Sequence, residues 1–151
     1  REYYLTDMIA MAVEQGRRVE TVTLADPVEG LGAGTRTELV AVERAFRQRT
    51  ANYWLTHGVT LIDPTSIYID SDVTIGVDTV IWPNTYLQGH TSIGEDCIIG
   101  PLVIARNCVI GRGCRVEHVV VENAAVPDGT TLRASSRLSI DPQKTGRKTN
   151  E

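Results

Sequence analysis

Apolar residues recur every six positions from about residue 69 onward. The step shortens to five residues at 99–104, 116–121 and 121–126. The first place of each unit is taken by Ile69, Ile75, Ile81, Leu87, Ile93, Ile99, Ile104, Ile110, Val116, Val121, Val126 and Leu132. Because a six-residue unit is too short to form a core of its own, the units must stack as a solenoid, with one short strand and one turn in each.

A second position of the repeat also keeps its type. The fifth place is always small or β-branched, and its members are Val73, Thr79, Thr85, Thr91, Cys97, Val103, Cys108, Cys114, Val120, Ala125, Thr130 and Ser136. Glycine takes the second place at 76, 94, 100 and 111. We expect the first-place side chains to fill the core and the fifth-place side chains to fit a crowded corner. We expect the glycines to permit a positive φ at the turn.

The three cysteines, Cys97, Cys108 and Cys114, all fall in the fifth place, where Thr and Val serve elsewhere. A metal site needs ligands that converge at suitable spacing, and no histidine is in register with these thiols. We therefore expect a packing role and no metal site. The odd number of cysteines and the absence of a CxxC motif favour reduced thiols in the cytoplasm.

The N-terminal part has a different pattern. Residues 6–15 have a helical apolar stripe, which we expect to be capped by Thr6 and ended by Gly16. The β-branched alternation of 17–24 predicts a strand, and the Pro/Gly-rich stretch 25–34 predicts a loop.

A longer helix is predicted over residues 35–57. Thr35 and Glu38 have the spacing of a capping box at its start, and Gly58 ends it. A short strand is expected at 59–62. The expected buried stripe of the helix consists of Leu39, Val42, Phe46 and Trp54.

The bulk composition excludes some classes of function. The 151 residues carry a net charge of −4, which argues against a nucleic-acid partner or an anionic membrane surface, because both reward a basic patch. No apolar run approaches the ~20 residues that span a bilayer. The chain starts without a Met or a signal peptide, so we expect it to begin inside a longer protein. Beyond the repeats, the polar residues 139–151 are expected to form a disordered tail.

The hexads resemble the left-handed parallel β-helix of hexapeptide-repeat transferases. EYYLTDMIAMA, the loop followed by TRTELVAVERAFRQR, and GVTLIDP running into the hexads look like the bacterial bifunctional N-acetylglucosamine-1-phosphate uridyltransferase/glucosamine-1-phosphate acetyltransferase. The five-residue step at 99–104 also looks like that family. The resemblance implies a mainly β fold: a left-handed β-helix over 59–138, a connecting helix over 35–58, and a remnant of an α/β nucleotidyltransferase domain over 1–34.

In that family, one half joins UTP to N-acetylglucosamine 1-phosphate with Mg²⁺, and the other half acetylates glucosamine 1-phosphate from acetyl-CoA. The product, UDP-N-acetylglucosamine, feeds peptidoglycan and lipopolysaccharide synthesis in the cytoplasm. The β-helices form homotrimers. The first strands and the nucleotide loop lie upstream of this chain, so UTP and sugar phosphate are expected as ligands only with that missing part.

Few functional residues carry over from the family. Tyr4 and Thr6 match positions that line the sugar-phosphate pocket; in this chain alone, without the rest of that pocket, Tyr4 is expected only to pack and Thr6 only to cap the first helix. Gly34 stands where the family has a Mg²⁺-binding Asn, and glycine has no side-chain oxygen for a hard cation. Ser139 falls near the place of an acetyltransferase Arg. We therefore expect no catalytic residue, no bound metal and no cofactor in this chain alone.

The three histidines are not at the family's catalytic positions. His57 is expected to cap the connecting helix, and His90 and His118 are expected to face solvent. His118 is the better of two weak candidates for a general base.

Three readings stay open from the sequence. The chain is part of the bifunctional enzyme or a shortened relative, a non-catalytic trimerisation scaffold, or a small hexapeptide acyltransferase. The last predicts a catalytic histidine on a loop that interrupts the hexads, and the sequence has no such insertion longer than one unit. Trp82 and Tyr86 lean outward and are either trimer contacts or packing partners of the connecting helix.

Overall fold

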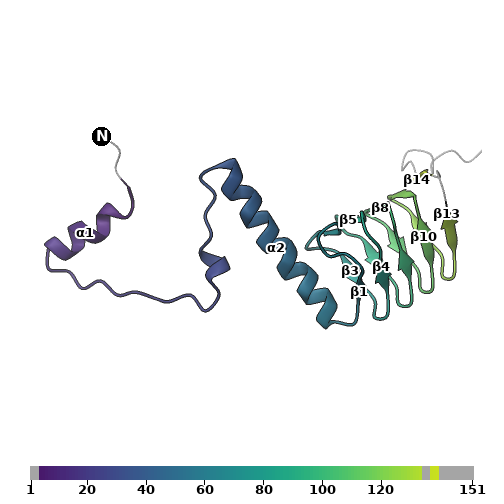
Figure 1. The fold of residues 1–151 in the computed structure, drawn as a ribbon, viewed down its shortest axis with the longest axis horizontal. Helices are drawn as coiled ribbons and strands as arrows, with labels where there is room; N and C mark the ends of the chain where they lie inside the picture. Colours follow the sequence, from purple (N-terminus) through teal and green to yellow (C-terminus); the bar gives the residue numbers. More distant parts are fainter. Residues whose placement is uncertain (1–3, 134–136, 140–151) are drawn as a thin grey trace, which may run out of the picture.

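The computed structural model describes residues 4–133 and 137–139, and its main body is a parallel β-helix with three flat sides (Figure 1). Each strand pairs in parallel with the strand three places later in the chain. The predicted β-helix of hexapeptide repeats is thereby confirmed. It begins at β1, inside the strand predicted at 59–62.

The strands form three sheets. Sheet A contains β1 (Thr60–Leu61), β4 (Val80–Ile81), β7 (Ile98–Ile99), β10 (Arg115–Glu117) and β13 (Thr131–Arg133). Sheet B contains β2 (Tyr68–Ile69), β5 (Tyr86–Gln88), β8 (Ile104–Arg106), β11 (Val120–Glu122) and β14 (Arg137–Ser139). Sheet C contains β3 (Thr74–Ile75), β6 (Ser92–Ile93), β9 (Val109–Ile110) and β12 (Ala125–Val126).

The core consists of first-place side chains stacked in columns, but the predicted register is wrong in one unit. Ala105, not Ile104, is buried in the core, because Ala105 is in register with Leu87 of β5 and Val121 of β11. Ile104 is half-buried on the outer face. The five-residue step therefore lies at 105–110 and not at 99–104.

Two fifth-place assignments were also wrong. Val119 is buried where Val120 was expected, and Ala124 packs against the core while Ala125 is exposed. The expected fifth-place residue Ser136 lies outside the described residues. Ser139 ends β14, so the polar tail begins after it, and residues 140–151 are also outside the described part of the chain.

The second-place glycines have a different role from the one predicted. Of the four, only Gly100 has a positive φ, +99°. A Cβ at Gly76 would lie 2.5 Å from the backbone nitrogen of Glu95, and one at Gly94 would lie 2.7 Å from that of Arg112. These glycines are required because the next coil approaches too closely for a side chain.

Positive φ occurs instead at the residue immediately before the fifth place. Its non-glycine members are Asp78, Asn84, Asp96, Leu102, Asn107, His118 and Asn123. Asn and Asp tolerate this conformation better than other side chains, which explains why they recur there.

Helix α1 (Asp7–Glu14) matches the first predicted helix. Thr6 does not cap it, because its backbone is already helical and its side chain makes no capping hydrogen bond. Gly16, with φ +68°, ends it as predicted, and its N–H donates to the Val13 carbonyl. No strand is described at 17–24, so that prediction is wrong: no described strand lies beside this segment to form the ladder that its β-branched residues suit.

Helix α2 (Arg36–Thr56) has the predicted capping box. The Thr35 hydroxyl accepts from the Glu38 N–H, and the Glu38 carboxylate accepts from the Thr35 N–H. A 3-10 turn, η1 (Pro27–Gly30), precedes α2. The helix ends at Gly58 as predicted, with φ +82°.

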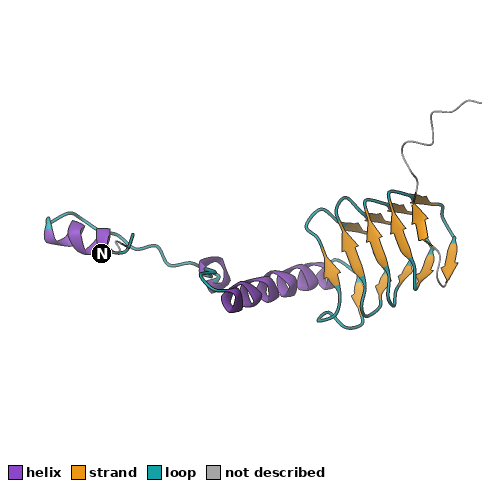
Figure 2. Ribbon diagram, turned by 90° about the horizontal axis from the view of Figure 1, so that it is seen from above, coloured by secondary structure: helices purple, strands orange, loops and turns teal. Residues whose placement is uncertain are grey.

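Helix α2 meets the β-helix only through its second half, where it contacts β1 and β2. The rest of the helix projects away from the first coil (Figures 1 and 2). Ala51 is its one buried residue, and Trp54 packs partly against the core. The buried stripe was therefore predicted wrongly at Leu39 and Phe46, which are 56% and 58% exposed. Neither described helix is long and apolar enough to cross a membrane.

Candidate functional site

Tyr4 and Thr6 lie just before α1, and both are exposed, Tyr4 by 63%. The Tyr4 N–H donates to the Asp7 carboxylate at 3.1 Å. In both ribbon views α1 is separated from the rest of the molecule by an extended segment (Figures 1 and 2). The structure therefore does not bring these two side chains together with other described elements, and their role in a sugar-phosphate pocket stays a prediction.

Gly34 lies in the loop before α2, where its N–H donates to the Glu38 carboxylate at 2.8 Å. Hydrogen bonds from the backbone N–H groups of Thr35 and Gly34 lower the pKa of Glu38. The described residues contain no group of three or more His, Cys, Asp or Glu side chains that could hold a metal ion. In the described part of the chain, this loop caps the start of α2.

The histidines take the positions expected of them. The His57 ring stacks on Tyr53 with 3.9 Å between ring centroids, and its Nδ1 lies 2.6 Å from the Tyr53 carbonyl oxygen, at the end of α2. His90 is exposed, with Nδ1 3.7 Å from a carboxylate oxygen of Asp72. His118 is an exposed turn residue with φ +54°.

The three thiols are buried at corners of the β-helix, as their place in the repeat predicts. The Cys97 thiol donates to the Gly111 carbonyl and the Cys114 thiol donates to the Pro127 carbonyl, both at 3.1 Å. Burial raises the pKa of the Cys97 and Cys108 thiols. The Cys97 and Cys108 thiols are thereby held as neutral packing groups.

Tyr86 packs toward α2 through an intermediate ring. It stacks on Tyr68 at 4.6 Å between centroids with 7° between planes, and the Arg47 guanidinium lies 3.7 Å from the Tyr68 centroid. Trp82, at the end of β4, is 42% exposed and lies against Gly100 of the next coil. For Tyr86, the predicted packing against the connecting helix is supported indirectly, through Tyr68 and Arg47. Trp82 is partly exposed in this chain, so its role as a trimer contact stays a prediction.

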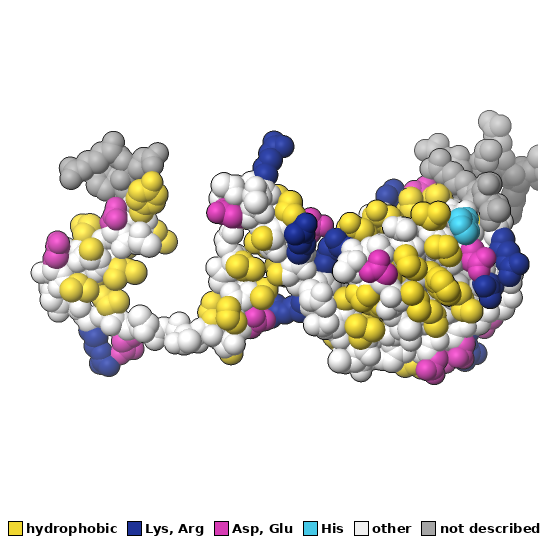
Figure 3. Space-filling model, in the orientation of Figure 1, with side chains coloured by type: hydrophobic (Ala, Val, Ile, Leu, Met, Phe, Trp, Pro, Cys, Tyr) yellow, Lys and Arg dark blue, Asp and Glu magenta, His cyan; other side chains and the backbone are white. Residues whose placement is uncertain are grey.

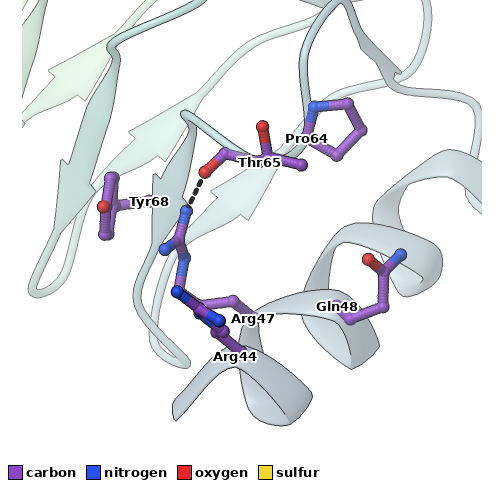
Figure 4. A pocket seen from close by; sticks show the side chains of 6 residues that line it. All are labelled: Arg44, Arg47, Gln48, Pro64, Thr65 and Tyr68. Atoms are coloured by element: carbon purple, nitrogen blue, oxygen red, sulfur yellow. Dashed lines mark hydrogen bonds between the residues drawn. The ribbon is translucent and has the colours of Figure 1, made fainter. Parts of the chain in front are cut away.

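A hollow lies at the junction of α2 with the first coil (Figure 4). We call it the junction groove. Its volume is about 510 Å³, and it is lined by Arg44, Arg47, Gln48, Pro64, Thr65 and Tyr68. Sequence reasoning missed it because the helix and the turn are brought together only by the packing of α2 on β1 and β2. The available signal was the spacing of Arg44, Arg47 and Gln48, which places them on one helical face.

Comparison with known proteins confirms the resemblance inferred from the sequence. The family described as bacterial transferase hexapeptide (six repeats) matches residues 72–104. The bifunctional protein GlmU of Carboxydothermus hydrogenoformans is 41% identical over 128 residues, which cover 85% of this chain and 29% of the relative. The protein of the same name from Caldanaerobacter subterraneus subsp. tengcongensis is 43% identical over 142 residues, covering 94% of this chain and 30% of the relative.

A third relative, the bifunctional protein GlmU of Desulfitobacterium hafniense, is 40% identical over 131 residues, covering 87% of this chain. This chain therefore spans a little under a third of the length of the curated relatives it matches.

Proposed function

We propose that this chain is part of, or a shortened relative of, the bifunctional enzyme that makes UDP-N-acetylglucosamine. That enzyme transfers a uridylyl group from UTP to N-acetylglucosamine 1-phosphate and an acetyl group from acetyl-CoA to glucosamine 1-phosphate, and its product supplies peptidoglycan and lipopolysaccharide precursors. The observation that carries the proposal is the similarity to bifunctional protein GlmU over 85% to 94% of the chain. Residues 1–34 would then be the end of the nucleotidyltransferase domain, 35–58 the connecting helix and 59–138 the first coils of the β-helix.

We propose that the chain alone is inactive in both reactions. Phosphoryl transfer depends on neutralising and positioning charge around the phosphates. Tyr4 and Thr6 are exposed, and Gly34 offers no side-chain oxygen to the Mg²⁺ that the family uses. The acetyl-transfer residues of the family belong to later coils. Mg²⁺ and acetyl-CoA would therefore serve only a longer protein that contains this chain.

Coupled assays with Mg²⁺ for both half-reactions test this proposal, run on the 151-residue chain beside its full encoded product. We expect UDP-N-acetylglucosamine from the long product and none from the short chain. Turnover by the short chain alone would overturn the inactivity. Failure of both would favour the second candidate function.

The second candidate is a non-catalytic trimerisation scaffold, which Gly34 favours because it replaces a metal ligand of the family. Self-association is also supported by the outer apolar residues of sheets A and B. Val80 and Ile98 are adjacent in register on sheet A, Tyr86 and Ile104 are adjacent on sheet B, and Leu102, between the two sheets, is 57% exposed. Apolar side chains gather on the face of the β-helix seen in Figure 3.

We propose that this surface joins three copies of the chain. A cytoplasmic location is part of the same proposal and is favoured by the three free thiols. The small acyltransferase reading has less support, because the strands between β1 and β12 follow one another without a long inserted loop.

A further inference from the structure

The junction groove carries positive charge without a matching acid. Arg44 and Arg47 both line it, and none of its lining residues is acidic. Neither arginine belongs to an ion pair formed by the described residues, whereas Arg49 of the same helix pairs with Asp26 at 2.7 Å and Glu29 at 3.2 Å. The helix therefore has one neutralised arginine on one face and two that lack a counter-ion on the groove side.

Asp63, which precedes Pro64 in the chain, does not supply the missing charge. One of its carboxylate oxygens accepts hydrogen bonds from both the hydroxyl, at 2.7 Å, and the N–H, at 3.1 Å, of Thr65. Hydrogen bonds from the Thr65 hydroxyl, then the Ser66 hydroxyl and the Thr65 N–H, lower the pKa of Asp63. The carboxylate thus closes its own turn, and the structure gives it no bond to either arginine.

Arg47 is fixed in place by neutral partners. Its guanidinium donates to the carbonyl of Thr65 and, at 3.5 Å, to that of Ile67, and it lies over the Tyr68 ring. Its Nε atom is buried without a hydrogen-bond partner. Removing a cation from water is costly unless a counter-charge or full hydrogen bonding offsets the loss, so this partly buried guanidinium favours an added anion.

Arg44 supplies a second, adjustable cation. It lies one helical turn before Gln48 and is exposed. Both arginines line the hollow, and Figure 4 shows their side chains rising from α2, with the Arg47 guanidinium reaching Thr65. Guanidinium groups suit oxyanions because their N–H groups form paired, charge-assisted hydrogen bonds. A volume of about 510 Å³ lies in the usual range of small-ligand sites.

We propose that the junction groove binds the oxyanion of a small phosphate-bearing molecule, with Arg47 as the fixed cation and Arg44 as the cation that closes on the ligand. The site lies where the helix meets the first coil, so a bound anion would stabilise that junction. The proposal does not depend on the enzymatic activity proposed above.

Titration calorimetry of the 151-residue chain with inorganic pyrophosphate, in EDTA and at low salt, tests the proposal. We expect saturable binding to one site that weakens as salt increases, because part of the attraction is screened. Arg44→Gln should weaken binding about tenfold or more through loss of a charge-assisted hydrogen bond. The Arg44 side chain forms no ion pair or hydrogen bond with the described residues, so this variant should keep the wild-type circular dichroism spectrum.

Arg112→Gln is the matched control. Arg112 is exposed and lies between β9 and β10, away from the groove, with its Nε 3.9 Å from Asp128. The control removes the same charge and should leave binding unchanged. In NMR spectra, amide shift changes on binding should concentrate at residues 44–48 and 63–68, which contain the residues that line the groove. Absence of saturable binding, an equal effect of the two variants, or shifts elsewhere would overturn the proposal.

Two further ligands distinguish the sources of the oxyanion. Tighter binding of glucose 1-phosphate than of inorganic phosphate would indicate that the groove also holds the attached organic group. Equal binding would indicate that only the oxyanion is recognised. Both results support the site.

Discussion

At the residue scale, the fifth place of the repeat is a buried corner for a small side chain, where threonine and cysteine can also donate to a carbonyl. Thr85 and Thr91 donate to the carbonyls of Trp82 and Gln88 at 2.7 Å. Cys97 donates to Gly111 instead. A hydroxyl and a thiol can therefore occupy equivalent corners, which explains why the sequence alternates between them without a chemical role for the thiols.

Because thiols are buried in the β-helix, the free energy of unfolding should depend on pH in the alkaline range. Burial raises the pKa of Cys97 and Cys108 above the usual value of 9.0. The unfolded chain then loses these protons at lower pH than the folded chain. The free energy of unfolding should be unaffected below the usual thiol pKa and should fall as pH rises through the higher folded values. Denaturant melts from neutral to alkaline pH measure this fall.

The double variant Cys97→Thr with Cys108→Thr is the control, because threonine occupies the same corner at Thr79 and Thr91. Its unfolding free energy should decline less steeply over the alkaline range. Equal slopes for the two proteins would show that the thiols do not cause the decline.

Gly94→Ala should destabilise the β-helix. A Cβ there would meet the Arg112 nitrogen at 2.7 Å and the Gly111 carbonyl carbon at 2.8 Å, and backbone cannot move aside as a side chain can. We expect a loss of about 1–3 kcal/mol in the free energy of unfolding, measured by urea denaturation. Gly32→Ala, which has nothing within 4 Å, should cause no comparable loss; similar losses in both variants would contradict the close-approach explanation.

At the scale of elements, the sequence predicted mainly those features that depend on residues close together in the chain. The six-residue repeat (apart from its register near Ile104), the capping box at Thr35 and the glycine that ends each helix were predicted correctly, because each depends on residues close together in the chain. The cap at Thr6, although equally local, does not form. The strand predicted at 17–24 was wrong, since a strand exists only where another lies beside it. The register error at Ile104 has a related cause: Ala105 is the weaker apolar residue, but the ladder with Leu87 decides which one faces inward.

The candidate sites also divide into those set by the local repeat and those set by tertiary packing. Corner cysteines and turn histidines could be placed from the repeat. The junction groove could not, because Arg47 meets Thr65 and Tyr68 only after the helix has packed on the first coil.

The capping box gives a prediction at this scale. Thr35→Ala removes the acceptor of the Glu38 N–H and should destabilise the start of α2 by about 0.5–2 kcal/mol. Amide hydrogen exchange at residues 36–40 reports this opening directly. Thr37→Ala, two residues further along the exposed face, removes no capping bond and should leave exchange nearly unchanged. If Thr37→Ala accelerates exchange as much, the box is not what holds the helix end.

At the scale of the whole molecule, the sides of the β-helix differ in polarity. The outer positions of sheet C include Thr74 and Ser92, whose hydroxyls hydrogen-bond to each other at 3.0 Å. Sheets A and B present Val80, Ile98 and Ile104 at outer positions, whereas the polar pair on sheet C is followed by Val109 in the same column. Exposed apolar residues gathered on neighbouring sides are typical of a surface that another molecule covers, and a symmetric assembly would use the same surface in every copy.

Two glutamate substitutions can show which side of the β-helix forms the contact between copies. Leu102 and Val109 are 57% and 55% exposed, so glutamate at either position costs a similar, small amount of folding stability. Leu102 lies between sheets A and B, and Val109 lies on sheet C. If three copies meet through the apolar side, Leu102→Glu places three carboxylates in or beside the contact, and like charges there are costly. Light scattering at tens of micromolar should then give a trimer mass for the wild type and Val109→Glu, and a monomer mass for Leu102→Glu. A monomeric wild type would contradict the proposed trimer. Dissociation by Val109→Glu but not by Leu102→Glu would indicate that the contact lies on sheet C.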